Sequence, residues 1–243
     1  MEQADFTIGA RVRLRGQNIG CARAGRPIFE GVTFTLTNGD IVTITGANGS
    51  GKTSLLRIIA GLLPMTDGQF IWDAENIPKR QNTAKSQQGA PLQKSRQQSI
   101  STICHFIAHQ NAVKGQLQVR ENLAFWANWF GAPMNIAKLD ELLQRVGLLG
   151  QADILASDLS VGQAKRLALA RLFIVPRALW LLDEPLAGLD EEGRQWLEEI
   201  ARAHLAQGGL ICVATHERLS LPSTILKLDS GTRDPHKRQR DHV

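Results

Sequence analysis

The sequence predicts an α/β domain in which helices cover a largely parallel β-sheet. Short apolar runs rich in β-branched residues alternate with amphipathic segments of helical period. One such run leads into a glycine-rich loop that opens a helix, and another ends in two adjacent acids. The chain has 243 residues, of which 43% are hydrophobic, enough for one large core with a small subdomain attached.

The glycine-rich loop is the most specific pattern in the chain. Its eight residues match G-x-x-x-x-G-K-[ST]: Gly46, Ala47, Asn48, Gly49, Ser50, Gly51, Lys52 and Thr53. An apolar run at 41–45 predicts a strand before the loop, and residues 53–60 predict a helix after it. The backbone N–H groups of such a turn and the positive end of the helix together bind phosphate. We therefore expect a nucleotide here, with Lys52 on its β- and γ-phosphates and Thr53 on Mg²⁺.

The first part of the chain is predicted to be mostly strands. Val12 and Leu14 alternate with arginines, further apolar runs follow up to residue 45, and Asn38-Gly39 is predicted to be a hairpin turn. Residues 69–72 predict another strand. The stretch 76–99 is polar and carries no periodic pattern, which indicates a surface insertion or a long flexible loop. A short apolar strand is expected again at 103–108.

The second part alternates helices and buried strands. Helical patterns cover 118–150, 160–173 and 193–206, and apolar strands are expected at 178–182 and 210–214. We therefore expect one domain over 11–228, with a helical insertion at about 110–160. The basic stretch 229–243 is expected to form a flexible tail.

Composition narrows the setting in which the protein works. No apolar run approaches the roughly 20 residues that cross a bilayer, and residues 1–5 do not resemble a signal peptide. Cys21, Cys104 and Cys212 are far apart, which favours buried free thiols in a reducing cytoplasm over a metal or redox site. Much of the net charge of +5 lies in the polar insertion and the tail. Those segments are expected to be solvated, with attraction to an anionic inner leaflet as the alternative.

The apolar strand at 179–182 runs directly into Asp183 and Glu184. In open α/β sheets, ligands bind at the carboxyl ends of the strands. We expect Asp183 to hold Mg²⁺, directly or through water, and Glu184 to polarise a water for attack on the γ-phosphate.

A second helix start lies before the acidic strand, at the sequence Leu-Ser-Val-Gly-Gln of residues 159–163. Ser160 can cap this helix, and Gly162 permits a close backbone approach. With the phosphate loop, the acidic strand, Gly188-Leu189-Asp190 and Thr215-His216, this makes five motifs in the order typical of ATP-binding cassette (ABC) ATPases. The chain resembles that family over nearly its whole length. The resemblance implies a P-loop NTPase fold, with a RecA-like core, an antiparallel β subdomain and a helical subdomain.

The resemblance also implies roles for residues outside the phosphate loop. In the family, two cassettes stack head to tail, and each ATP with its Mg²⁺ lies between one phosphate loop and the partner's signature motif. The signature motif corresponds to residues 159–163 of this chain. Ser160, Gly162 and Gln163 would then contact the γ-phosphate across a homodimer interface, and Asp190 would link the two sites. His216 would act as a catalytic residue that keeps the γ-phosphate and the attacking water in register.

Two family positions are altered in this sequence. The aromatic residue that usually stacks on adenine is absent, and counting back from Gly46 places Arg23 there. A guanidinium also stacks on purines, so we expect Arg23 to replace the aromatic residue and to discriminate weakly between bases. The glutamine that joins Mg²⁺ to the transporter aligns with His109 by an ungapped count, while Gln110 is its neighbour. Both remain candidates, with His109 favoured.

The segment 108–126 refines the resemblance. Its Ala-His-x-x-x-x-Lys run, followed by Glu-Asn-Leu-Ala-Phe-Trp, is similar to the ATP-binding export subunits of cytochrome c maturation, also called haem exporter ATPases. That likeness implies membrane permease partners of this system, a place on the cytoplasmic face of the bacterial inner membrane, and hydrolysis tied to release of haem-loaded chaperone. No direct haem binding is expected, since no C-x-x-C-H run is present.

Two other functions stay open at this point. One is the ATPase of another ABC exporter, for drugs, lipids or polysaccharide. The other is an ABC ATPase acting on nucleic acid, which the basic charge favours but the single cassette does not, so no nucleic-acid partner is expected.

Overall fold

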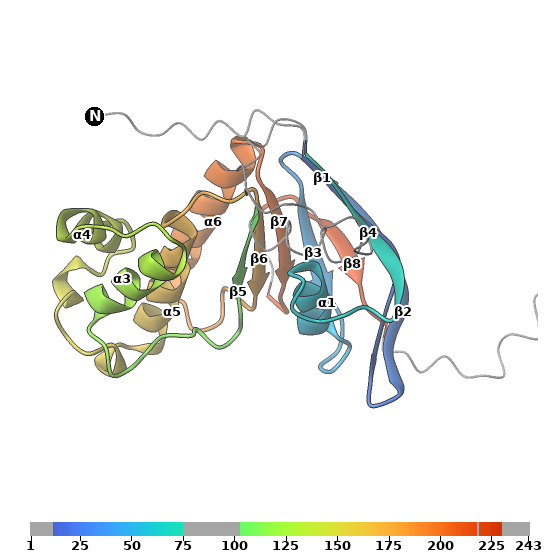
Figure 1. The fold of residues 1–243 in the computed structure, drawn as a ribbon, viewed down its shortest axis with the longest axis horizontal. Coiled ribbons are helices and arrows are strands. Elements are labelled where there is room, and N and C mark those ends of the chain that lie inside the picture. Colours follow the sequence, from blue (N-terminus) through green and yellow to red (C-terminus); the bar gives the residue numbers. More distant parts are fainter. Residues whose placement is uncertain (1–11, 75–102, 218, 230–243) are drawn as a thin grey trace, which may run out of the picture.

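The computed structural model describes residues 12–74, 103–217 and 219–229 (Figure 1). Its centre is a five-stranded parallel sheet with the order β5-β6-β7-β3-β8. These strands are β3 (Ile41–Thr45), β5 (Cys104–Ile107), β6 (Leu179–Asp183), β7 (Leu210–Ala214) and β8 (Thr224–Lys227). The predicted α/β class with a parallel sheet is confirmed. The polar stretch 76–99 and the tail, apart from Asp229, lie outside the described residues.

Both faces of the parallel sheet are covered at β6 and β7, which explains why these two strands are mostly apolar. In β6, Leu179 and Leu181 face the core that contains α1 (Lys52–Ile59). The alternate residues Trp180 and Leu182 face the core that contains α6 (Glu191–Ala206). Every residue of β6 and β7 is buried.

A second, antiparallel sheet closes the α1 side, at the right of Figure 1. Its order is β2-β1-β4, formed by β1 (Val12–Arg23), β2 (Arg26–Thr37) and β4 (Asp67–Ala74). The hairpin between β1 and β2 turns at Ala24 and Gly25, which have φ angles of 50° and 73°. Two positive φ angles are the requirement of a two-residue hairpin turn whose twist matches its strands.

The hairpin predicted at Asn38-Gly39 is wrong. A tight turn does lie there, with the Asp40 N–H donating to Thr37 O at 2.9 Å, but it joins strands of different sheets. The strand after it, β3, is apolar on both faces and is buried between β7 and β8. A strand that is buried on both faces is typical of a parallel sheet, whereas the strands of a hairpin commonly keep one face in water.

Helices α3 (Val119–Trp129) and α4 (Ile136–Arg145) form a third core together with the inner face of α5 (Val161–Ala170). Short 3₁₀ turns at Leu149–Gln151, Ala156–Asp158 and Arg171–Phe173 complete this region. Gly131, with a φ of 69°, follows α3, and the Asn135 side chain caps α4 by accepting from the Lys138 N–H. None of the helices among the described residues combines the length and the apolar character needed to span a bilayer.

The aromatic cluster of α3 is divided between the core and the surface. Trp126 and Phe130 pack against the third core, whereas 72% of Trp129 is exposed. Phe125 is half-buried and stacks on Trp129, with ring centroids 6.4 Å apart. One part of the cluster therefore holds the helix in place, and the other part faces outward.

The three cysteines are free and buried, as the sequence predicted. Burial raises the pKa of Cys104 to about 11 and that of Cys212 to about 12. Because the thiolate is the reactive form of cysteine, these side chains behave as small apolar core residues.

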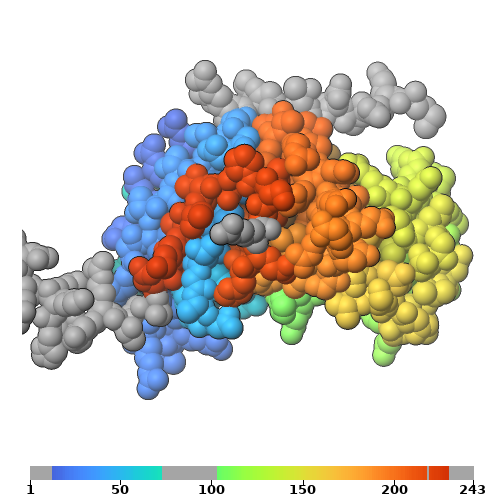
Figure 2. Space-filling view, turned by 180° about the vertical axis from the view of Figure 1, so that it is seen from behind, coloured from blue at the N-terminus to red at the C-terminus, as the bar shows by residue number. Residues whose placement is uncertain are grey.

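The rear view shows how the C-terminal strand completes the sheet. In Figure 2, residues of β8 and the segment before it (red) lie across the β3 part of the chain (light blue) and beside α6 (orange). The α4 region (yellow-green) forms the far end of the molecule from the antiparallel sheet.

Gly68 of β4 packs tightly against the backbone of β1 in the antiparallel sheet. A Cβ at this position would lie 2.3 Å from Asn18 O and 2.4 Å from Gln17 O, and the φ angle is 87°. Gly25 has a similar φ angle but open space around it. We predict that Gly25→Ala lowers the free energy of unfolding by about 1 kcal/mol, the usual cost of the left-handed backbone. Gly68→Ala should lower it clearly further, because the backbone of β1 must also move. Urea unfolding of both variants measures the difference, and equal losses would contradict the clash.

Candidate functional site

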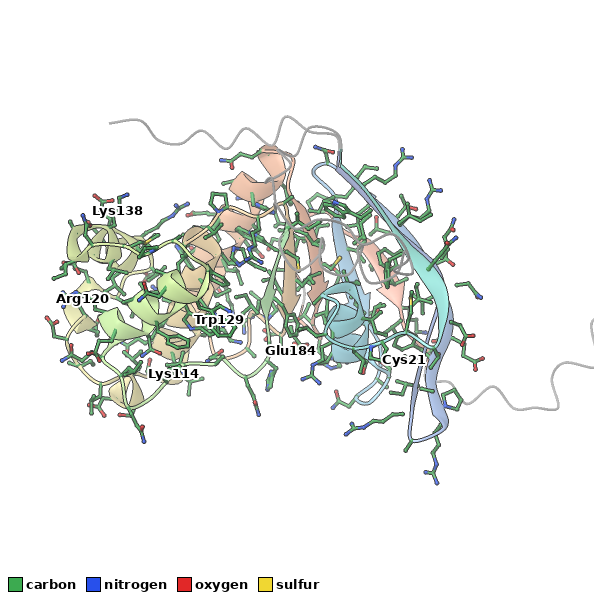
Figure 3. All side chains as sticks on the ribbon, viewed as in Figure 1. Cys21, Lys114, Arg120, Trp129, Lys138 and Glu184 are labelled. Carbon is green, nitrogen blue, oxygen red and sulfur yellow. The ribbon has the colours of Figure 1, made fainter. Side chains whose placement is uncertain are left out.

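The carboxyl ends of neighbouring parallel strands bring the predicted motifs to one edge of the sheet. β3 leads into the phosphate loop, β6 ends at Asp183 before Glu184, and β7 is followed by Thr215 and His216. Because the strand order there is β6-β7-β3, these three segments are neighbours. Figure 3 places Glu184 between α1 and the part of the molecule formed by α3 and α5.

The phosphate loop is shaped by backbone angles and close contacts that require glycine. Gly51 precedes α1 with a φ of 97°, and a Cβ there would lie 2.6 Å from the Phe29 ring. At Gly46, a Cβ would lie 2.5 Å from Ser50 Oγ and 2.6 Å from Leu228 O. β2 and the residue after β8 therefore press on the loop from two sides and hold its backbone in place for an anion.

Lys52 lies folded over the loop and is mostly buried. Its Nζ donates to Gly46 O at 3.0 Å and to Ala47 O at 3.3 Å, and it lies 2.9 Å from His216 Nε2. An ammonium only donates hydrogen bonds, so His216 Nε2 accepts and the ring carries its proton on Nδ1. The pairing brings a residue of the loop and a residue after β7 to the same point.

Thr53 and Asp183 form a pair of oxygen ligands. Thr53 Oγ1 donates to the Asp183 carboxylate, 2.9 Å from Oδ2 and 3.1 Å from Oδ1. Asp183 is only 3% exposed. Hydroxyl and carboxylate oxygens beside a phosphate site are the hard donors that Mg²⁺ prefers, so the residues present fit this ion.

Glu184 follows Asp183 in an uncommon backbone conformation. Its φ angle is 47°, in the left-handed region, which costs a non-glycine residue about 1 kcal/mol. Its N–H donates to Ala214 O at 2.8 Å, at the end of β7. The Glu184 side chain is 18% exposed; its Oε2 accepts from the His216 backbone N–H, with N and O 3.4 Å apart, and its Oε1 lies 3.7 Å from His216 Nε2. Strained residues of this kind are found where function requires one side-chain direction.

The signature segment begins α5 with a complete capping box. Ser160 Oγ accepts from the Gln163 N–H at 3.2 Å, and Gln163 Oε1 accepts from the Ser160 N–H at 2.9 Å. The predicted N-cap is confirmed. Ser160 itself, at the start of this helix, is exposed.

A comparison with known protein families agrees with this set of motifs. The sequence model of the family described as ABC transporter matches residues 29–187. The chain belongs to this family.

Curated relatives cover almost the whole chain. The chain is 41% identical over 219 residues to a protein of Bradyrhizobium diazoefficiens called "Cytochrome c biogenesis ATP-binding export protein CcmA", covering 89% of this chain and 98% of that protein. Proteins with the same name from Mesorhizobium japonicum and Haemophilus influenzae are 38% and 37% identical, over 89% and 88% of this chain and 98% and 93% of theirs.

Solved structures share the fold at low sequence identity. A putative ABC transporter ATP-binding protein of Pyrococcus furiosus matches with a TM-score of 0.70 and 23% identity, over 89% of this chain and 97% of its own. A bacterial Atm1-family ABC exporter with ATP bound matches with a TM-score of 0.72 and 20% identity, over 90% of this chain and 37% of the exporter. The ABC ATPase fold predicted from the motifs is confirmed, and the chain is an ATP-binding ATPase subunit of an ABC transporter.

The residues at the two altered family positions are exposed. Arg23 is the last residue of β1, at the tip of the first hairpin and opposite Arg26. His109 and Gln110 follow β5 at the same edge of the sheet as the other motifs, and both side chains are exposed. Their roles in nucleotide binding stay predictions.

The structure adds residues that the sequence did not single out. Lys165 on α5 is buried and donates to Glu184 O at 3.2 Å. Arg166, the next residue, lies 3.1 Å from the Asp190 carboxylate. The Gly193 N–H and then Arg166 lower the pKa of Asp190. The sequence pattern could have indicated that Lys165 is buried, because Ala168, Leu169 and Leu172 follow it at helical spacing on one apolar face.

Two variants distinguish stacking by Arg23 on the base from the effect of a positive charge at the hairpin tip. We predict that Arg23→Ala weakens binding of ATP and GTP by similar factors of about fivefold, the value of one exposed cation–π contact. Arg26→Ala removes an equal charge from the facing strand and should leave both affinities near wild type. Titration with a fluorescent nucleotide measures the affinities, and an unchanged affinity in Arg23→Ala would remove Arg23 from the site.

Proposed function

We propose that this chain is the ATP-hydrolysing subunit of a haem-export complex for c-type cytochrome maturation. The observation that carries the proposal is the likeness, at 37–41% identity and over nearly their full lengths, to proteins named cytochrome c biogenesis ATP-binding export proteins. The segment 108–126, similar to the same group, supports it independently of the nucleotide motifs.

In the proposed reaction, the phosphate loop and Lys52 hold the triphosphate of ATP. Thr53 and Asp183 would hold Mg²⁺, which when bound offsets negative charge on the phosphates. Glu184 then accepts a hydrogen bond from a water and directs it at the γ-phosphate. His216, already beside both Lys52 and Glu184, keeps the phosphate and the water aligned.

A second copy of the chain is proposed to complete each site. Ser160 is exposed and begins a helix whose N-terminal turn attracts anions, while its own chain's phosphates would lie elsewhere. Stacked head to tail, each copy would present Ser160, Gly162 and Gln163 to the γ-phosphate held by the other, with Asp190 between the two sites.

Membrane permease subunits pair with ABC ATPase subunits. In this chain, the proposed contact with the permease is the exposed part of the α3 aromatic cluster. Trp129 is exposed, it stacks on Phe125, and Lys114 Nζ lies 4.4 Å from the centre of the Phe125 ring. In Figure 3, Lys114 lies below α3, whose last residue is Trp129. A permease loop with apolar and acidic residues would suit this surface and would hold the subunit on the cytoplasmic face of the bacterial inner membrane. Hydrolysis would then drive release of haem-loaded chaperone.

Glu184→Gln tests the proposed chemistry. The amide keeps the shape of the side chain but cannot accept a proton, so turnover should fall on the order of 1,000-fold while ATP binding persists. ATP should then trap a dimer, which size-exclusion chromatography detects. Glu141→Gln, an exposed change on α4, is the matched control and should hydrolyse ATP normally. Near-normal turnover in Glu184→Gln would remove Glu184 from this role.

Deleting the chain from its host tests the biological assignment. We predict that haem-stained c-type cytochromes disappear, and that the wild-type chain restores them while Glu184→Gln does not. The control is a haem protein that binds its haem without covalent attachment, which should persist in the deletion strain. Normal cytochromes would contradict the proposal and favour another ABC exporter.

A further inference from the structure

The signature helix α5 holds the segment 184–190 at three points. Lys165 Nζ donates to Glu184 O at 3.2 Å. A Cβ at Gly162 would lie 2.9 Å from Gly188 O, so the two backbones touch there. Arg166 binds the Asp190 carboxylate. One helix therefore contacts the beginning, the middle and the end of the turn that follows β6.

Lys165 is the buried member of these contacts. It is 2% exposed, whereas both Ser160 and Asp190 lie at the surface. Burial lowers the pKa of Lys165, and the carboxylates of Asp183 and Glu184 oppose this shift. Burying an ammonium is costly unless it is paired and hydrogen-bonded. Lys165 has a hydrogen bond to the Glu184 carbonyl and feels the favourable charges of the Asp183 and Glu184 carboxylates. An apolar residue would fill the same space at lower cost, so packing alone does not explain a lysine here.

Three hydrogen bonds hold the backbone of Glu184, and Lys165 donates one of them. Its N–H is held by Ala214 O, and its carbonyl oxygen accepts from Lys165 Nζ and, at 3.3 Å, from the Ala187 N–H. With a φ of 47°, the residue is in a conformation that relaxes unless its surroundings hold it. The direction of the carboxylate follows from that backbone, because the side chain begins at the same strained Cα.

We propose that Lys165 is a positioning residue that fixes the Glu184 carboxylate for its work on water, acting through the Glu184 carbonyl. The inference rests on the proposed function of Glu184 as the residue that polarises water. Lys165 would also link the signature motif to Glu184, because it lies in the helix that begins at that motif. A movement of that helix reaches Glu184 through one hydrogen bond.

Three variants of the full chain separate positioning from packing. Lys165→Met keeps the length and the apolar stem of the side chain but removes the donor. Lys165→Gln keeps a neutral N–H donor on a shorter stem. Lys138→Met, at an exposed lysine of α4, is the matched control. For each, kcat and KM for ATP are measured by steady-state hydrolysis, and folding is checked by the thermal unfolding midpoint.

Lys165→Met should lower kcat by roughly 100-fold, the scale of an approximately 1 Å misplacement of a reacting group. Its KM should stay within about twofold of wild type, because the phosphate loop is not touched. Lys165→Gln should recover part of the lost kcat, and Lys138→Met should match wild type. In the Glu184→Gln background, Lys165→Met should lower turnover little further, since the carboxylate that it positions is already absent.

Two results would overturn the inference. One is a folded Lys165→Met variant with wild-type kcat. The other is a loss of turnover by the same factor in the presence and absence of the Glu184 carboxylate. If Lys165→Met does not fold, Lys165→Leu, which also lacks the donor, replaces it in both tests. If Glu184→Gln itself hydrolyses ATP normally, the proposed function fails, a result distinct from either of these.

Discussion

The hydrogen bond from Thr53 to Asp183 joins the two halves of the site, although 130 residues separate them. It forms because β3 and β6 are parallel strands of one sheet, each flanking β7, so their carboxyl ends lie at the same edge. Thr53 is the second residue of α1, and Asp183 is the last residue of β6. The geometry of the phosphate loop, of the proposed metal ligands and of the residues after β7 depends on this alignment.

The two faces of the parallel sheet support different parts of the site. The face that packs on α1 and the antiparallel sheet shapes the phosphate loop, since Ile28 and Phe29 of β2 press against Gly51. The other face packs on α6 and supports the residues after β6 and β7. The third core, between α3, α4 and α5, places the signature motif and the outward aromatic residues on one rigid unit.

Much of the site was predictable because its residues sit in patterns that local physics requires. A glycine turn between an apolar strand and a helix has few alternatives, and an apolar strand that ends in two acids must place them at a sheet edge. The roles of Arg23, His109 and Gln110 were harder to predict, because they rest on counting from a motif and not on a pattern of their own. The polar stretch 76–99 has no periodic pattern, so its sequence contains no comparable information.

The sequence by itself determined the α/β class and the family and predicted the nucleotide site, because strand runs, glycine spacing and paired acids are local features. It misplaced the hairpin at Asn38-Gly39, since the turn residues are the same whether the next strand returns to its neighbour or enters another sheet. Only the tertiary structure decided that β3 joins β7 and β8, that Lys52 meets His216, and that Lys165 reaches Glu184. Those contacts join segments distant in the chain, and the packing of the sheet and α5 alone determines which of them meet.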